Sequence, residues 1–221
     1  MMASSAMTYA HTPAWFASHA DIRTDGYALL AALLRQPSSE NLIPILQSLR
    51  WDGALPEKMG RALEALHQAA QNCPPGVLEK EYHNLFIGLG SGELIPYASW
   101  YRNNTLASLA LASLRADLAR LGIVTQADSH ESEDQAGAVC EIMALLSHMG
   151  NSISDKAQAD FFRQHVASWM ITFFEDLQSA KAADFYRTVG SFGRCFLECE
   201  HEYLKYWTDR NKQEVHHGNG I

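Results

Sequence analysis

Three side chains near the carboxyl end of the chain are of the types that bind transition metals. Cys195, Cys199 and His201 lie within seven residues, and the two cysteines are four residues apart. A helix would place both thiols on one face. Structural zinc sites, however, take four ligands, usually in closely spaced pairs. The spacing therefore favours packed core thiols over a metal site, and we expect no bound metal and no other cofactor.

The residue types that perform catalysis show no recognisable arrangement. The histidines are scattered, and the chain contains no nucleophile-elbow, zinc-protease or lysine-containing phosphate-loop motif. The glycine-rich run 88–92 lacks the lysine of a phosphate loop and the strand that precedes one, so it indicates a turn. We expect no catalytic residues and no enzymatic activity.

An acidic loop is the more informative polar feature. Asp128, Glu131, Glu133 and Asp134 lie within seven residues, directly before a predicted helix. Acidic side chains in a first helical turn are stabilised by the helix dipole, so the cluster can be purely structural. Carboxylates also match the planar guanidinium of arginine, so the loop can instead receive arginine side chains from a partner.

Aromatic and apolar residues form a second feature between about residues 82 and 101. An apolar helix end at 82–87 runs into glycines and then into a turn that contains Pro96, Tyr97, Trp100 and Tyr101. This surface suits an apolar peptide. A peptide with arginines followed by an apolar stretch, the composition of a twin-arginine signal peptide, would satisfy both features if they lie side by side in the fold.

Composition limits the class of protein. The chain has 221 residues, of which 47% are apolar and 19% charged, as in an ordinary globular domain. A net charge of −8 argues against nucleic-acid binding, which requires basic surface. No apolar run approaches the roughly 20 residues needed to span a bilayer. The N-terminal residues do not form a secretory signal, and four unpaired cysteines fit a reducing compartment, so we expect a cytoplasmic location.

Helical periodicity runs through almost the whole chain and positions these features. We expect helices at about 21–34, 38–49, 56–70, 77–87, 106–121, 136–146, 154–166, 168–177 and 185–206, with 93–101 as a loop. Ile45 is expected on the inward face of the second helix, and Leu106 and Leu109 on that of the fifth.

The last of these helices has the clearest pattern. Its inward residues recur at steps of four and three: Phe185, Val189, Phe192, Phe196, Cys199, Tyr203 and Tyr206. This period is typical of a buried bundle helix, with a dimeric coiled coil as the alternative. No segment shows the alternation of a strand. The sequence predicts an all-α fold, a single-domain helical bundle of roughly nine to ten helices over residues 21–207. We expect a flexible segment at 1–20 and a polar tail at 208–221.

The aromatic and acidic segments resemble the TorD/DmsD/NarJ family of redox-enzyme maturation chaperones. The similarity is carried by Tyr82-x-x-Leu85-Phe86-x-Gly88, Pro96-Tyr97-Ala98-Ser99-x-Tyr101, Glu131-Ser132-Glu133-Asp134-Gln135 with Glu141 and Met143, Phe161-Phe162-x-x-His165-x-x-x-Trp169, Phe173-Phe174-x-Asp176-Leu177 and Phe185-Tyr186-x-x-Val189-Gly190. It covers residues 75–205 well and the first helices only in layout.

The resemblance implies a cytoplasmic chaperone without catalytic activity. Such a protein binds the twin-arginine signal peptide or the apoenzyme of a molybdenum oxidoreductase before export, as a monomer or homodimer. The peptide-binding residues implied by position are Tyr82, Phe86, Pro96, Tyr97, Ser99, Trp100, Tyr101, Glu131, Asp134 and Gln135, although Tyr82 and Phe86 fit a core role better. The family's loop usually reads Glu-Pro-x-Asp-His; here Ser132 and Gln135 replace its proline and histidine.

Two other functions are compatible with the sequence. A helical assembly module would bind a partner without recognising signal peptides. A metal- or nucleotide-binding regulator would use the Cys195–Cys199 helix or the glycine turn.

Overall fold

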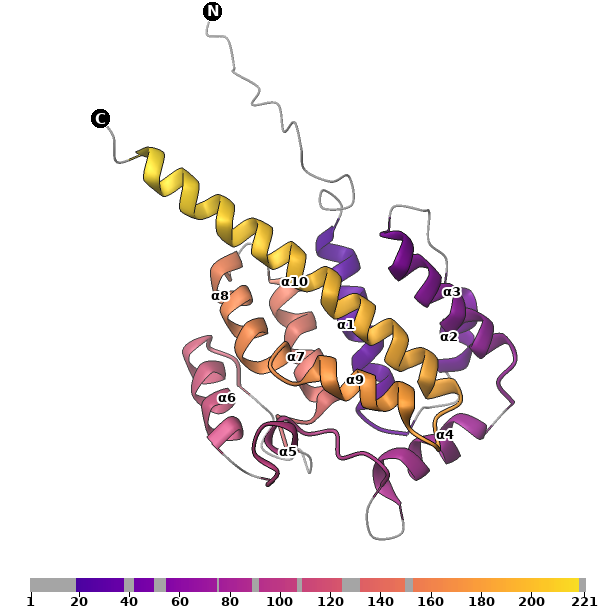
Figure 1. Cartoon of the computed structure of the whole chain (residues 1–221). Coiled ribbons are helices and arrows are strands. Elements are labelled where there is room, and N and C mark those ends of the chain that lie inside the picture. Colours follow the sequence, from indigo (N-terminus) through magenta and orange to yellow (C-terminus); the bar gives the residue numbers. More distant parts are fainter. Residues whose placement is uncertain are drawn as a thin grey trace, which may run out of the picture.

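The computed structural model describes residues 19–37, 42–49, 55–74, 76–88, 92–106, 109–124, 132–149 and 153–218. This part of the chain forms ten α-helices and two π-helical segments, η2 and η3 (Figure 1). They are α1 (His19–Leu34), α2 (Leu42–Ser48), α3 (Glu57–Gln71), α4 (Val77–Tyr82), η2 (His83–Ile87), α5 (Ala98–Asn103), α6 (Leu109–Arg120), α7 (Ala136–His148), α8 (Asp155–Phe161), η3 (Phe162–Val166), α9 (Met170–Ser179) and α10 (Phe185–Gly218). The predicted all-α bundle is confirmed.

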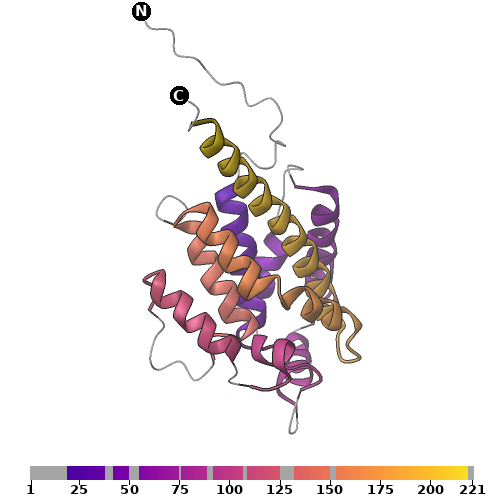
Figure 2. The same cartoon turned by 60° about the vertical axis from the view of Figure 1, so that its left-hand side comes forward.

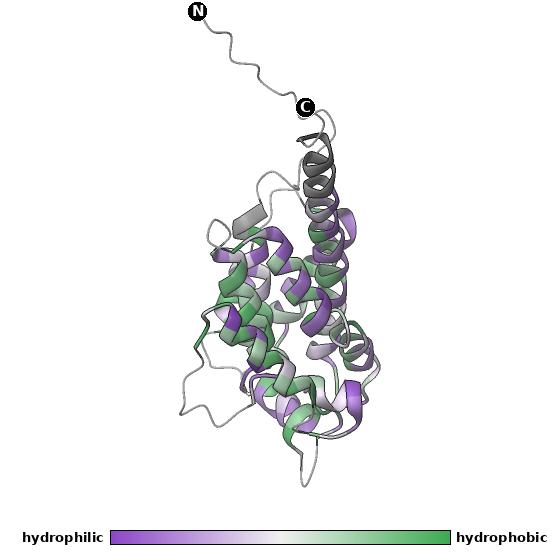
Figure 3. Cartoon of the chain, turned by 90° about the vertical axis from the view of Figure 1, so that its left-hand side faces the viewer, coloured by the Kyte–Doolittle hydropathy of each residue, from purple (hydrophilic) through white to green (hydrophobic). Residues whose placement is uncertain are grey.

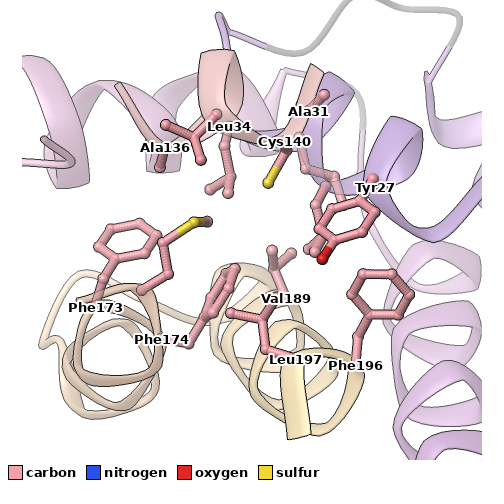
Figure 4. Close-up of a cluster of buried hydrophobic side chains, with 14 of the residues drawn as sticks. Tyr27, Ala31, Leu34, Ala136, Cys140, Phe173, Phe174, Val189, Phe196 and Leu197 are labelled. Atoms are coloured by element: carbon pink, nitrogen blue, oxygen red, sulfur yellow. The ribbon is translucent and has the colours of Figure 1, made fainter. Parts of the chain in front are cut away.

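The core lies between two pairs of helices, α1 with α7 and α9 with α10. Figure 4 shows side chains from all four helices pointing into the space between them. The smaller helices cover the sides of this core: α3 packs on α10, and α2 packs on α3. Both Figures 1 and 2 place α5 at the opposite end of the bundle from the last turns of α10.

The close approach of α1 and α10 depends on a glycine and a buried ion pair. A Cβ on Gly26 would lie 2.3 Å from the ring of Phe196, so this crossing excludes a larger residue. Nearby, Arg23 binds Glu200 with its Nε and Nη2, at 2.8 Å and 2.7 Å, and also donates to Gln158. Both charges are almost completely buried, so loss of either partner would leave the other uncompensated.

The predicted inward face of the last helix is confirmed where it meets the core. Phe185, Val189, Phe192 and Phe196 are buried on α10, and Cys199 and Tyr203 are half-buried. The apolar pattern ends at Tyr206, whereas α10 continues to Gly218. Along the ribbons of Figure 3, hydrophilic and hydrophobic residues alternate, as expected for helices that each cover one side of a core.

Three local predictions were wrong. Residues 98–103, expected as loop, form α5. Asn104, in the left-handed conformation at φ 53°, ends α5. Leu109, the first residue of α6, is 84% exposed, and Leu106 is exposed as well. Ile45 is 53% exposed, because the buried face of α2 is formed by Leu42 and Leu46.

Candidate functional site

The aromatic turn and the described end of the acidic loop, residues 132–134, lie side by side, as the sequence hypothesis requires of this part. The backbone N–H of Ala98 donates to the carbonyl of Asp134 at 2.9 Å, and that of Ala136 donates to the carbonyl of Pro96 at 2.8 Å. Tyr97 and Gln135 form an isolated antiparallel bridge between these bonds. We call these two segments, residues 96–101 and 132–136, the junction.

Asp134 holds the junction together from the inside. Its Oδ2 accepts a hydrogen bond from the backbone N–H of Ser99 at 2.9 Å, in the first turn of α5, and its Oδ1 accepts one from the hydroxyl of Ser132. The residue is 1% exposed. This carboxylate therefore acts as a helix cap supplied from a distant part of the chain, and both of its oxygens are already used.

Gln135 joins the junction to the end of α1. Its Oε1 accepts from the backbone N–H of Ala138 at 3.0 Å and so caps α7, while its Nε2 donates to the carbonyl of Leu34. Tyr82 donates its hydroxyl to the same Leu34 carbonyl at 3.2 Å. Gly137 allows the close contact of α7 with the end of α1, because a Cβ there would lie 2.6 Å from the backbone nitrogen of Arg35.

The aromatic residues before the junction are part of the core. Tyr82 is buried, and Phe86, which is partly buried, packs against it with ring centroids 4.9 Å apart. Phe86 also contacts the rings of Phe173 and Tyr186. Both residues thus support the junction from behind and present little surface to a partner.

The outward side of the junction carries a different set of groups. Trp100 is 37% exposed on α5. Tyr101 is half-buried; its hydroxyl donates to Asp176 at 2.9 Å, and burial together with that carboxylate raises its pKa. Glu133 receives the guanidinium of Arg115 in a forked arrangement, with Nη2 to Oε2 at 2.8 Å and Nε at 3.1 Å from both oxygens. The described outward side of the junction therefore carries an exposed indole and a carboxylate that is paired with Arg115.

The structure does not describe Glu131 or the predicted polar loop before it. The remaining residues expected at the site fall into two groups. Those that are buried or half-buried and hold the junction are Tyr82, Phe86, Pro96, Tyr97, Ser99, Asp134 and Gln135; Trp100 and Tyr101 are the ones that face outward or lie at the edge.

One residue that sequence reasoning missed positions the long helix behind the site. The carboxylate of Glu81 accepts three backbone hydrogen bonds at the start of α10, from Asp184, Phe185 and Tyr186, at 2.7, 3.1 and 2.7 Å. The residue is buried. No local signal marks it, because the helix that it caps begins more than a hundred residues later in the chain.

The candidate metal ligands on α10 do not form a site. Cys195 and Cys199 are half-buried and His201 is exposed, and among the described residues no group of three His, Cys, Asp or Glu side chains is placed to hold a metal ion. Burial raises the pKa of Cys199 to about 11. Most of the glycine run 88–92 lies outside the described residues. No helix in the described part of the chain combines the length and apolar character needed to cross a membrane.

An apolar groove that the sequence did not reveal lies on another face. It has a volume of about 780 Å³ and is formed by α1, α2, α3 and one residue of α10. Its lining includes Ile22 and Leu29 of α1, Ile45 of α2, and Met59 and Leu63 of α3. These residues come from three helices, and we call the feature the α1–α3 groove.

Comparisons with known proteins agree with this architecture. The family model described as "Nitrate reductase delta subunit" matches residues 52–175. The chaperone protein TorD of Vibrio cholerae serotype O1 is 25% identical over 182 residues, which cover 77% of this chain and 80% of TorD. The probable Tat proofreading chaperone DmsD of Haemophilus influenzae is 26% identical over 175 residues, 74% of this chain and 82% of DmsD.

A solved structure has the same fold. A candidate redox enzyme maturation protein from Archaeoglobus fulgidus superposes with a TM-score of 0.56 at 18% sequence identity, and the match covers 79% of this chain and 93% of that one.

Proposed function

The chain belongs to the nitrate reductase delta subunit family, as its resemblance to TorD, DmsD and NarJ predicts, and on that premise we propose that it is a maturation chaperone for a redox enzyme. Its client is the apo form of a molybdenum-cofactor oxidoreductase that carries a twin-arginine signal peptide. The chaperone acts in the cytoplasm, binds this precursor and performs no turnover.

The forked pair between Glu133 and Arg115 is the observation that carries the peptide site. It demonstrates a carboxylate at the junction whose surroundings accept a guanidinium through two nitrogens. A client arginine has the same group and would replace Arg115. Trp100, exposed on the neighbouring segment, gives an apolar side chain beside the client's arginines a flat surface.

The proposed site therefore has two kinds of residue. Trp100, Tyr101, Glu131 and Glu133 contact the peptide. The residues that hold these in place are Tyr82, Phe86, Pro96, Tyr97, Ser99, Asp134 and Gln135.

The two residues that differ from the family's usual loop, Ser132 and Gln135, both form hydrogen bonds that support the junction. Ser132, where proline is usual, donates its hydroxyl to Asp134, which proline cannot do. Gln135, where histidine is usual, both caps α7 and binds the end of α1. We infer that these replacements preserve the shape of the junction and leave peptide recognition to the outward residues.

A titration of fluorescent twin-arginine peptides into Trp100→Ala tests the site. Loss of an anchoring aromatic costs about 2 kcal/mol or more, roughly a thirtyfold weaker Kd. The matched control is Val77→Ala on α4, which is 39% exposed and lies outside the junction. Equal affinities of the two variants would remove Trp100 from the site. Binding of the client without its signal peptide would favour a helical assembly module.

A further inference from the structure

The α1–α3 groove has the character of a binding site and plays no part in the junction. Its volume, about 780 Å³, is within the range of roughly 300–1,000 Å³ that ligand sites occupy in proteins. Its floor and walls are aliphatic side chains, including Leu29, Leu42, Met59 and Leu63. Ile45 contributes to its lining with 53% of its surface exposed.

One charge interrupts this apolar lining. Asp25 is the single ionisable residue among those that form the groove, and it is exposed. Its carboxylate makes no hydrogen bond or ion pair with any residue in the described part of the chain. The groove thus combines apolar surface with one unmatched negative charge.

These properties select a narrow class of occupant. An apolar helical segment places side chains at steps of three and four residues into such a groove. A lysine or arginine at its edge would meet Asp25, and the charge of −8 on the chain favours the approach of a basic segment. A fully apolar segment would leave the carboxylate beside hydrocarbon, and an acidic one would be repelled.

We propose that the α1–α3 groove binds the apolar run of the client's signal peptide, with a basic side chain of that peptide at Asp25. This inference rests on the proposed function, because it assigns a second contact to the same peptide.

The geometry of α1 connects the two contacts. Leu34, at the end of α1, is bound by Gln135 of the junction, and Asp25 lies nine residues earlier on the same helix. At 1.5 Å per residue this separation is about 14 Å along the helix axis, a length that about four extended residues cover. The two proposed contacts thus lie on parts of the fold that α1 connects.

Charge placed in the groove tests the proposal in solution. Ile45→Glu adds a carboxylate where the apolar run would lie, at a position exposed enough to leave folding intact. We expect it to weaken binding of a fluorescent twin-arginine peptide at least tenfold. Val77→Glu, on an apolar residue of α4 that is 39% exposed and outside the groove, serves as the matched control and should change the Kd less than twofold. Asp25→Asn should weaken binding a few fold and reduce its dependence on salt.

The same variants separate this inference from the proposed function. If Trp100→Ala weakens binding and Ile45→Glu does not, the groove is not the site of the apolar run, while the peptide-binding function stands. If the unmodified protein binds no twin-arginine peptide, both fail.

A photo-crosslinker identifies the occupant directly. With Ile45→p-benzoylphenylalanine and the signal peptide present, irradiation should attach position 45 to the apolar run of the peptide. Attachment to residues 1–18 of the same chain, or to a second copy, would assign the groove to that occupant and overturn the inference.

Discussion

The backbone N–H of Ser99 donates to Oδ2 of Asp134 at 2.9 Å, across 35 residues of sequence. Through this bond a carboxylate of the acidic loop caps the first turn of α5. This member of the acidic cluster therefore has a structural role. Asp134 supports the junction, and the carboxylate that we propose for the client's arginine is Glu133.

The first prediction follows from this bond. Asp134→Ala should lower the free energy of unfolding by about 1–2 kcal/mol, because it removes the cap of α5. Urea denaturation measures the change. Asp25→Ala, at an exposed aspartate without a partner in the described structure, should leave the unfolding midpoint unchanged. A fully stable Asp134→Ala protein with weakened peptide binding would instead make Asp134 a direct peptide contact.

Glu81→Gln should destabilise the bundle more than any surface change on α4. The substitution keeps the shape of the side chain but removes the charge that three backbone N–H groups of α10 share. We expect a loss of about 1–3 kcal/mol, seen as a Tm lower by about 2–4 °C for each kcal/mol. The control is Glu79→Gln, an exposed carboxylate two residues earlier on the same helix. Equal Tm values for both variants would show that Glu81 does not hold the start of α10.

Arg115→Ala should strengthen binding of a twin-arginine peptide, because Arg115 competes with the client for Glu133. Exposed ion pairs contribute about 0.2–1 kcal/mol, so the Kd should fall by up to about fivefold. Arg61→Ala breaks the exposed pair with Glu57 on α3 and should have no effect on the Kd. Weaker binding by Arg115→Ala would mean that Arg115 contacts the peptide itself.

The thiols should react slowly at neutral pH. Burial raises the pKa of Cys199 to about 11 and also raises that of Cys195, so both remain protonated at pH 7.5. The thiolate is the reactive form, so alkylation should accelerate as pH rises towards the pKa. Iodoacetamide labelling followed by mass spectrometry measures the rates, with urea-unfolded protein as the reference. Rapid labelling of folded Cys199 at pH 7.5 would indicate a lowered pKa and reopen a reactive or metal-binding role.

The period of the apolar residues predicted burial correctly where a helix packs on the core through one face. The residues of the pattern from Phe185 to Phe196 are buried as expected. The hypothesis that the aromatic and acidic segments lie side by side came from the chemistry of the two features, because nothing in the sequence could prove their contact.

The features that escaped prediction depend on contacts between distant residues. A six-residue helix such as α5 has no apolar period to detect, and its cap, Asp134, follows much later in the sequence. The resemblance implied Asp134 as a peptide contact, and its burial depends on the bond to the distant Ser99. The α1–α3 groove is assembled from helices whose individual patterns give no sign of an opening between them.

The most direct test of the account is binding of a twin-arginine signal peptide compared with its Lys-Lys variant. Fluorescently labelled peptides from the molybdenum oxidoreductases of the source organism are titrated with the purified full chain. We expect saturable binding that weakens clearly when lysine replaces both arginines, because an ammonium group cannot reproduce the forked contact that Glu133 makes with a guanidinium. Equal affinity for the two variants, or no binding of any peptide, would contradict the assignment of the junction as an arginine-recognition site.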